Sequence, residues 1–388
     1  MHLNLFAIFL MNINVGLIFS GSPVIKKLDI NEEQALRGEY SIPDNIPLNK
    51  VENLLIGQSF HWESEINGIF PGEIHLSDNS QFTVNTLPLE IYLKCVVGSE
   101  MNPSAPAEFL KCHSIVSRSW AVGKILGFHR HDNEGKISNN DEIITWNDTG
   151  DHSGFDVCSD DHCQRYQGLQ KISAEAAEAI DSTSGMVLVD GNDQIIDARF
   201  SKCCGGQTEL FSSCWQQSEP SSLRSFPDPW CDLSSMKDNE RRKLLDSILK
   251  DYDRQTEGGY RWSSSITRSE VATNLKTKFN RDIGKILSLE PIEIGPSGRI
   301  IRLRINGEKG SLILGKELAI RRLLSRNHLY SSAFEITTTP DSFFLSGKGW
   351  GHGVGMCQIG AAHSAAKGHT AEEILSFYYP GATIKKLY

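Results

Sequence analysis

Three groups of residues have types and spacings that suit chemistry. The first is Glu100, which follows the apolar run LKCVVGS and precedes Met101 and Pro103. Such surroundings desolvate a carboxyl group and favour its neutral form, as a general acid requires. A glutamate in a turn is more often a solvated surface residue, and that alternative stays open. The sequence therefore indicates Glu100 as a candidate general acid.

A second group combines imidazole and thiol side chains in one short segment, DHSGFDVCSDDHCQRY. His152, Cys158 and Cys163 have the spacing H-x5-C-x4-C, and His162 is a spare imidazole. Such side chains can surround a tetrahedral Zn²⁺, with the fourth ligand from elsewhere in the chain or from water. The spacing between the cysteines is longer than in the usual C-x2-C knuckle. A disulfide between Cys158 and Cys163 is therefore the alternative to a zinc site.

The third group is a glycine-rich segment, GKGWGHGVGM, at residues 347–356. Its glycines alternate strictly, so neither of the phosphate-binding patterns G-x-G-x-x-G and G-x-x-x-x-G-K-[ST] fits it. Alternating glycines instead let the backbone approach a ligand closely while His352 and Met356 project from it. A flexible turn with an exposed histidine is the simpler alternative.

The sequence patterns around these groups predict an α+β domain with antiparallel strand meanders and packed helices around a cleft. Polar and apolar residues alternate over 51–84, which is typical of strands. Helical patterns cover 87–97 and 106–127, and the turn between them carries the candidate acid. A helix at 172–182 and a hairpin at 185–200 are expected to follow.

The second half of the chain predicts a smaller inserted α/β lobe. Residues 236–339 begin with a charged, amphipathic segment and continue with a helix at 269–279 and several strands. We therefore expect the main domain to comprise residues 49–235 and 340–388. In its last part, Thr370 and Glu373 form a capping box that predicts a C-terminal helix.

The N-terminal segment predicts export. Residues 3–19 are almost wholly apolar, but they are too few for the roughly 20 residues of a spanning helix. Small residues follow, so residues 1–22 resemble a signal peptide, although no Lys or Arg precedes the apolar run. Residues 23–48 are polar and are expected to be a linker. The protein is thus expected in the periplasm or cell envelope, and not as an integral membrane protein.

Charge and cysteine content exclude one class of partner and suggest a redox state. The 388 residues carry 39 Lys and Arg against 48 Asp and Glu, a net charge of -9, which offers no basic surface for nucleic acid. In an oxidising compartment, the nine cysteines favour disulfides over metal ligands. Three of them, Cys95, Cys112 and Cys357, lie in apolar or helical contexts and are expected to be core residues.

Four sequence blocks together resemble the stage II sporulation protein D family of peptidoglycan lytic transglycosylases, which also includes the amidase enhancers. In chain order the blocks are LPLEIYLKCVVGSEMNPSAPAEFLKCHSIVSRSWA, CSDDHCQRYQG, FSKCCGGQTE and GWGHGVGMCQIGAAHSAAKGHTAEEILSFYYPG. The resemblance extends from about residue 50 to residue 387. Trp120, Cys357 and Ile359 replace residues usual in the family, which puts the fine specificity for substrate in doubt.

The resemblance implies roles for single residues. The family's catalytic glutamate falls on Glu100 and its helix arginine on Arg118, which would orient the sugars or balance charge. The zinc segment falls on His152, Cys158 and Cys163. Contacts with substrate in the cleft fall on Gly351, His352, Gly353 and Gln358. Four further cysteines go beyond the best-known members, and we expect paired disulfides among them: Cys203, Cys204, Cys214 and Cys231.

The implied reaction is cleavage of the β-1,4 bond between N-acetylmuramic acid and N-acetylglucosamine in peptidoglycan glycan strands. Ordinary glycosidases need two carboxylates. A lytic transglycosylase can use one, because the C6 hydroxyl of the muramic acid attacks its own anomeric carbon and leaves a 1,6-anhydro end. Two alternatives remain: a non-catalytic glycan binder that activates a cell-wall amidase, and a metallohydrolase with the Cys/His ion as Lewis acid.

Overall fold

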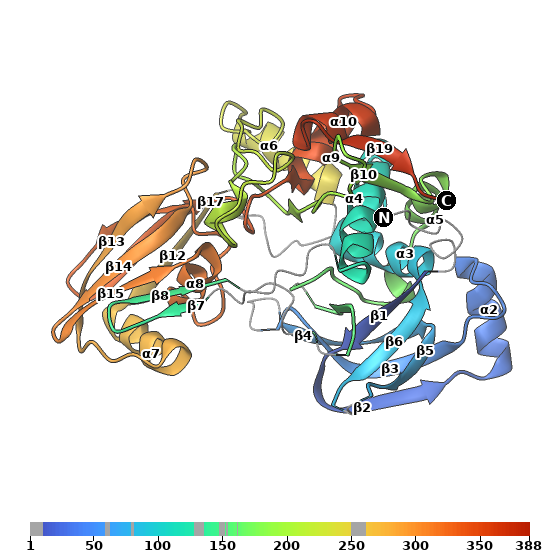
Figure 1. Ribbon diagram of the computed structural model, residues 1–388, viewed down its shortest axis with the longest axis horizontal. Helices are drawn as coiled ribbons and strands as arrows, with labels where there is room; N and C mark the ends of the chain where they lie inside the picture. The colour runs from blue at the N-terminus through green and yellow to red at the C-terminus, as the bar shows by residue number, and fades with distance from the viewer. Residues whose placement is uncertain are drawn as a thin grey trace.

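The computed structural model describes residues 11–58, 63–78, 81–127, 136–146, 152, 154–160, 162–249 and 261–388. These residues form α-helices together with antiparallel and mixed sheets, which confirms the predicted α+β class. Figure 1 shows a main lobe, which contains the C-terminus, and a smaller lobe built largely of strands. None of the described helices has both the length and the apolar character that crossing a bilayer needs.

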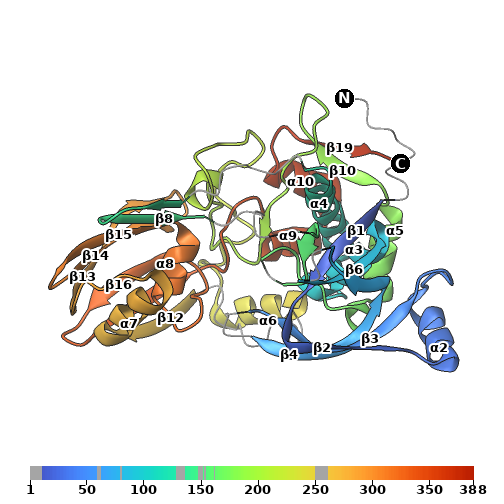
Figure 2. The same ribbon diagram turned by 60° about the horizontal axis from the view of Figure 1, so that its bottom comes forward.

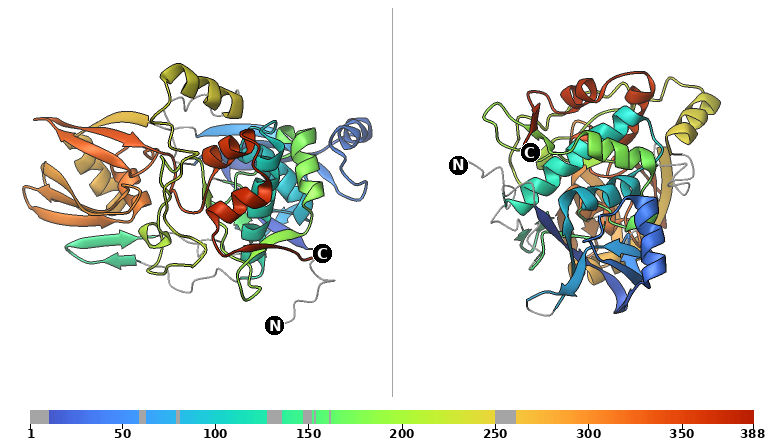
Figure 3. Two further views of the ribbon diagram at one scale, coloured as in Figure 1. Left: turned by 90° about the horizontal axis from the view of Figure 1, so that it is seen from above. Right: turned by 90° about the vertical axis from the view of Figure 1, so that its right-hand side faces the viewer.

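A bundle of helices forms the centre of the main lobe. The helix α4 (Ala107–Ile125) is buried over most of its length, as expected for a helix in the middle of a core. Around it pack α3 (Leu89–Glu100), α5 (Ala174–Ser182), α9 (Gln358–Ala366) and α10 (Ala371–Tyr378). Figure 3 shows this arrangement from two further sides. The predicted helices at 87–97, 106–127 and 172–182 are therefore confirmed, with shifted ends.

A four-stranded sheet packs beside these helices. Its strand order is β5 (Glu73–Leu76), β6 (Thr83–Pro88), β1 (Asn12–Leu17) and β9 (Val157–Cys158). The strand β1 runs antiparallel to β6 and parallel to β9. The strand β9 thus connects the Cys/His segment to the core through the N-terminal strand.

Residues 12–17 of the predicted signal peptide at 1–22 form the strand β1 in the structure. Ile13 and Val15 of β1 are fully buried in the main core. A short apolar run suits a buried strand as well as a signal-peptide core, so the signal peptide stays a prediction beside this pairing. Residues 1–10 of the predicted signal peptide lie outside the described residues.

The prediction that residues 23–48 form a linker is wrong. These residues form most of β2 (Phe19–Lys27), the helix α2 (Ile30–Tyr40) and the start of β3 (Leu48–Ile56). The carboxylate of Asp29 caps α2 by accepting the N–H of Glu32 at 2.9 Å. With β4 (Ser64–Pro71), β2 and β3 form a three-stranded antiparallel sheet.

Two short strand pairs join the C-terminal residues to the main lobe. The strand β10 (Met186–Val189) pairs with β19 (Thr383–Lys386), so the predicted hairpin at 185–200 is reduced to a single bridge between Val189 and Ile195. The strand β11 (Phe200–Ser201) runs parallel to β18 (Met356–Cys357). This second pair brings the end of the glycine-rich segment beside residues 200–202.

The small lobe consists of two sheets and two helices. The larger sheet has the strand order β13, β14, β15, β8 and β7, and the smaller has β12, β17 and β16. The strands of the larger sheet are β13 (Ile286–Ile294), β14 (Ile300–Gly307), β15 (Gly310–Gly315), β8 (Glu142–Thr145) and β7 (Lys136–Ser138). Those of the smaller sheet are β12 (Arg261–Thr267), β17 (Ser342–Lys348) and β16 (Phe334–Thr338). The helices are α7 (Arg268–Phe279) and α8 (Glu317–Leu323).

The predicted bounds of the inserted lobe, 236–339, therefore change at both ends. The strands β7, β8 and β17 come from outside that range, because sheet pairing joins segments far apart in the sequence. The charged helix α6 (Asp238–Leu249) packs against α9 of the main lobe instead. Figure 2 shows α6 apart from the sheets of the small lobe.

Candidate active site

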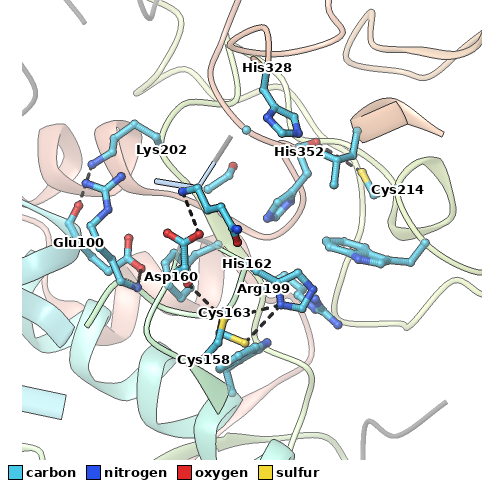
Figure 4. Close-up of a pocket in the computed structure, with 18 of the residues that line it drawn as sticks. Glu100, Cys158, Asp160, His162, Cys163, Arg199, Lys202, Cys214, His328 and His352 are labelled. Atoms are coloured by element: carbon cyan, nitrogen blue, oxygen red, sulfur yellow. Dashed lines mark hydrogen bonds between the residues drawn. The ribbon is translucent and has the colours of Figure 1, made fainter. Parts of the chain in front are cut away.

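A cavity of about 550 Å³ lies between the two lobes. The main lobe contributes Glu100, Cys163 and Lys202 to its lining, and the small lobe contributes Glu317 and His328. Figure 4 shows Glu100, Cys163, Lys202 and His328 around this space. Its volume is in the range of pockets that hold small organic ligands, so it is the candidate active site.

Glu100 is the last residue of α3 and is 9% exposed. The prediction that it lies in a turn is wrong, because the helix continues through Gly98. A Cβ atom at Gly98 would lie 1.8 Å from the carbonyl oxygen of Lys171, so the glycine serves close packing there and does not end the helix. At this position the carboxyl meets the negative end of the helix dipole, which favours its neutral form.

Two donors beside Glu100 favour the carboxylate form instead. The backbone N–H of Arg165 donates to Oε1 of Glu100 at 2.7 Å. The Nζ of Lys202 donates to the backbone carbonyl oxygen of Glu100 at 2.7 Å and contacts Sδ of Met101 at 3.2 Å. The carboxyl group of Glu100 thus lies at a helix end, with one N–H donor and one ammonium group close to the residue.

The cavity also contains the Cys/His cluster. His152, Cys158, His162 and Cys163 each offer one ligand atom, and these four atoms all lie within 4.8 Å of one another. The Nε2 of His152 is 2.9 Å from Sγ of Cys163, and Nδ1 of His162 is 3.6 Å from the same sulfur. The structure thus brings the three predicted ligands together and adds His162. Two imidazoles and two thiols form a donor set that suits a tetrahedral metal ion.

His352 lines the cavity, as predicted, and is positioned by its own loop. The N–H of Val354 donates to Nδ1 of His352 at 3.0 Å, which leaves Nε2 as the free position of the imidazole. The ring packs edge-on against Trp215, with 4.9 Å between the ring centroids. Burial lowers the pKa of His352 well below its usual value, and the nearby guanidinium groups of Arg199 and Arg299 add to this. The imidazole is therefore neutral.

The two predicted cleft glycines differ in position. Gly351 lines the cavity at a φ of +87°, a backbone conformation that favours glycine. Gly353 is buried and is not part of the lining. A Cβ atom at Gly353 would lie 2.6 Å from Cζ of Arg299, so this glycine makes room for a buried guanidinium and not for a sugar.

Gln358 lines the cavity at the start of α9 and is 1% exposed. Its Nε2 lies 2.8 Å from Nε2 of His113, whose Nδ1 lies 3.1 Å from Oγ of Ser117. Burial is the main cause that lowers the pKa of His113 to about 3, so this imidazole is neutral and can accept from the Gln358 amide. The chain of three side chains positions Gln358 in the cavity wall.

Arg118, expected to orient the sugars, is not among the residues that line the cavity. Its Nε and Nη2 atoms donate to the two carboxylate oxygens of Glu90 at 2.7 Å each. Its Nη1 donates to the carbonyl oxygen of Met186 at 3.1 Å, and its side chain is fully buried. Arg118 therefore connects α4 to α3 and to the first residue of β10.

Several lining residues were not predicted from the sequence. They are spread over distant segments, and both Arg165 and Lys202 lie within blocks used for the resemblance and donate to Glu100. Aromatic and basic side chains predominate among them: Trp120, Trp146, Trp215, Trp350, Arg165, Arg199, Arg321 and Arg322. One carboxylate, Asp160, accepts the backbone N–H groups of Gly57 and Gln58 at 2.6 and 3.0 Å.

Comparison with known families matches two parts of the chain. Residues 77–189 match the family described as stage II sporulation protein, and residues 209–355 match a domain of unknown function. The first range contains Glu100 and the Cys/His cluster. The second range contains much of the small lobe and His352.

Comparison with single proteins finds relatives at about one quarter identity. The stage II sporulation protein D of Bacillus subtilis is 26% identical over 81% of this chain and 80% of its own length. An uncharacterized protein of Brachyspira hyodysenteriae is 26% identical over 79% of this chain and 69% of its own length. The amidase enhancer of Bacillus subtilis is 25% identical over 75% of this chain but 40% of its own length. The predicted family relationship is confirmed.

Proposed function

Because residues 77–189 match the stage II sporulation protein family and the relatives include stage II sporulation protein D and an amidase enhancer, we propose that the chain is a lytic transglycosylase of peptidoglycan. The relatives support a role related to the cell wall. Glycan strands lie outside the cytoplasmic membrane, so the proposal includes action in the periplasm or cell envelope. The single observation that carries the reaction is the placement of Glu100 in the cavity lining, beside the Arg165 N–H donor.

In the proposed reaction Glu100 first acts as an acid and then as a base. Its carboxyl donates a proton to the glycosidic oxygen, and the bond from that oxygen to C1 of the muramic acid breaks. The C6 hydroxyl of the same sugar attacks C1, and its proton goes to the Glu100 carboxylate. The attacking hydroxyl belongs to the substrate itself, so the reaction has a proximity advantage that can reach about 7–11 kcal/mol.

The lining of the cavity suits a charged glycan. Trp120, Trp215 and Trp350 contribute aromatic surface to the lining, against which sugar rings can pack. Arg322 contributes positive charge from the small lobe, which complements the carboxylate on the lactyl group of muramic acid, whereas Arg321 is paired with Glu317. The neutral His352 and Gln358 add hydrogen-bonding groups to the same wall.

The Cys/His cluster fits the zinc ion that the family resemblance implies. His152, Cys158, His162 and Cys163 would hold it. The ion would supply structural bracing, because four ligands from this chain leave no open coordination position for substrate. A reaction with metal as Lewis acid is therefore less well supported than one with Glu100.

The test is the pattern of products from Glu100→Gln, which keeps size and hydrogen bonding but removes the transferable proton. We expect the release of 1,6-anhydromuropeptides to fall about 10²–10⁴-fold, with folding and sedimentation with sacculi unchanged. Glu178→Gln is the matched control, because Glu178 is exposed on α5. Mass spectrometry of digests of intact sacculi and of peptide-stripped glycan provides the measurement.

An amidase enhancer is the second candidate, because one relative carries that name. Such a protein would release no anhydro products from either substrate, and it would stimulate an added amidase equally well with Glu100 or Gln at that position. Anhydro products released by the parent protein, and lost in the Gln variant, would exclude this alternative.

A further inference from the structure

A second cluster of thiols lies in the main lobe, outside the cavity lining. Ligand atoms of Cys204, Asp228, Cys231 and Cys357 all lie within 4.8 Å of one another. All four residues are buried, with at most 1% of any of them exposed. They come from three separate segments: Cys204 from the loop after β11, Asp228 and Cys231 from the turn at 228–231, and Cys357 from the position directly before α9.

The sulfur of Cys357 is surrounded by backbone donors. Cys357 caps α9, and its Sγ accepts the N–H of Gly360 at 3.4 Å. The same sulfur accepts the N–H of Cys204 at 3.3 Å. These two contacts hold the Cys357 sulfur beside Cys204, at the start of α9.

Asp228 provides an oxygen ligand next to the sulfurs. Its Oδ1 accepts the N–H groups of Trp230 and Cys231 at 3.1 Å each, and its Oδ2 accepts the hydroxyl of Tyr378 at 2.8 Å. Oδ2 also lies 3.3 Å from Sγ of Cys204. Asp228 is fully buried, and no basic side chain among the described residues forms an ion pair with it. Buried charges are normally paired or coordinate a metal.

We propose that Cys204, Asp228, Cys231 and Cys357 bind one zinc-like divalent ion, separate from the Cys/His cluster. Three thiolates and one carboxylate form a soft, tetrahedral donor set of the kind that zinc prefers. Zn–S distances of about 2.3 Å place tetrahedral ligands roughly 3.8 Å apart, which agrees with the observed clustering. The proposal does not depend on the proposed function.

The ion would brace the wall of the active site. Cys204 follows Lys202 by two residues, and Gln358 follows Cys357 directly. The loop that carries Lys202 is also joined to Trp350 by two backbone hydrogen bonds through Cys203, of 3.0 and 2.8 Å. An ion bound to Cys204 and Cys357 would therefore connect two segments of the cavity wall. One carries Lys202, whose ammonium group lies beside Glu100, and the other carries Gln358 at the start of α9.

A disulfide is the competing interpretation of the same thiols. The Sγ atoms of Cys203 and Cys231 lie 3.5 Å apart, so a small movement would bring them within bonding distance. The predicted paired disulfides were to use Cys203, Cys204, Cys214 and Cys231, but all nine cysteines are free in the structure. Cys214 lies elsewhere, with its sulfur 3.8 Å from the carbonyl oxygen of His352.

The first test uses the metal content of protein purified without chelator. To separate the two clusters, the measurement is made in a background with Cys158→Ser and Cys163→Ser. We expect one equivalent of zinc per chain in this background and loss of that equivalent on adding Cys231→Ser or Cys357→Ser. Cys214→Ser is the matched control, a buried thiol outside the cluster, and it should keep the ion. Full zinc content with Cys231→Ser would overturn the proposal.

A second test uses the unmodified chain and so does not depend on variants that fold. Thiol alkylation before and after treatment with a chelator, mapped by mass spectrometry, should show protection of Cys204, Cys231 and Cys357 that is lost with the metal. Cobalt substitution should add sulfur-to-metal absorption bands for this site. A mapped disulfide that contains Cys204, Cys231 or Cys357 in freshly isolated protein would overturn the proposal.

Discussion

The ammonium group of Lys202 lies 2.7 Å from the backbone carbonyl oxygen of Glu100. The bond satisfies one of the carbonyl groups left free at the end of α3 and keeps a positive charge at the negative end of the helix dipole. The side chain of Lys202 passes the ring of Trp350, 5.6 Å from its centroid. Lys202 thus connects the acid to the glycine-rich loop across the cavity.

We expect Lys202→Met to lower the rate of glycan cleavage and to move the alkaline limb of the pH–activity profile to higher pH. Loss of a neighbouring positive charge makes the Glu100 carboxyl easier to protonate, so the acid form persists at higher pH. Lys202→Arg keeps the charge and should keep the limb in place. The measurement is the initial rate of anhydro-product release across the pH range. An unchanged profile for the Met variant would show that Lys202 is too remote to influence the acid.

For Arg118 the structure predicts a role in stability. Arg118→Met should reduce the free energy of unfolding by about 3 kcal/mol, because it leaves the largely buried Glu90 carboxylate without its partner. Lys111→Met removes a more exposed pair with Glu108 and should cost less than about 1 kcal/mol. Urea unfolding measures both variants. A normal midpoint with loss of cleavage would instead support the sugar-binding role that the family resemblance implies.

Because of His113, we expect the stability of the folded protein to depend on pH. Its pKa is about 3 in the folded protein, below the usual value near 6.5, so the unfolded chain binds more protons between these values. The contribution of His113 to stability is therefore complete above pH 6.5 and falls as the pH drops from 6.5 towards 3. The expected slope approaches 1.4 kcal/mol per pH unit in the middle of this window. Chemical unfolding of the parent and of His113→Gln at pH 7 and pH 5 provides the comparison, and the Gln variant should lose less stability on acidification.

Local sequence patterns predicted the parts of the fold that depend on neighbours in the chain. The helices α3, α4 and α5 follow from apolar periodicity, and the capping box of Thr370 and Glu373 starts α10 as expected. The same local logic ended α3 too early, at 97. Gly98 lies inside the helix, where the carbonyl oxygen of Lys171 packs closely against it.

Features that depend on distant partners were not predictable in this way. The apolar run that includes Ile13 and Val15 has the length of a signal-peptide core, and only its pairing with β6 identifies it as a strand. Cys357 was expected to be a core residue and Cys204 a disulfide partner, yet their sulfurs meet through the β11–β18 pairing. His162 was only a spare imidazole in the sequence, and the structure brings its ring together with the other three candidate ligands.

The glycine at position 353 provides the last prediction. The sequence led us to expect that Gly353→Val would abolish cleavage and leave the fold largely intact, because the glycine was placed against the sugar. In the structure a Cβ atom there would lie 2.6 Å from Cζ and Nη1 of Arg299, which is fully buried and donates to the carbonyl oxygen of Gly351 at 2.9 Å. The φ of +79° adds strain for a β-branched residue.

We therefore now expect Gly353→Val to destabilise the whole protein by at least about 2 kcal/mol, since it displaces a buried charge from its partners. Gly381→Val is the control, because it has a similar φ of +83° but no atom within 4 Å of its Cβ position. Thermal midpoints and rates of product release, measured on both variants, distinguish the two explanations. A Gly353→Val protein with a thermal midpoint equal to that of the control and no cleavage would instead support contact between this glycine and the substrate.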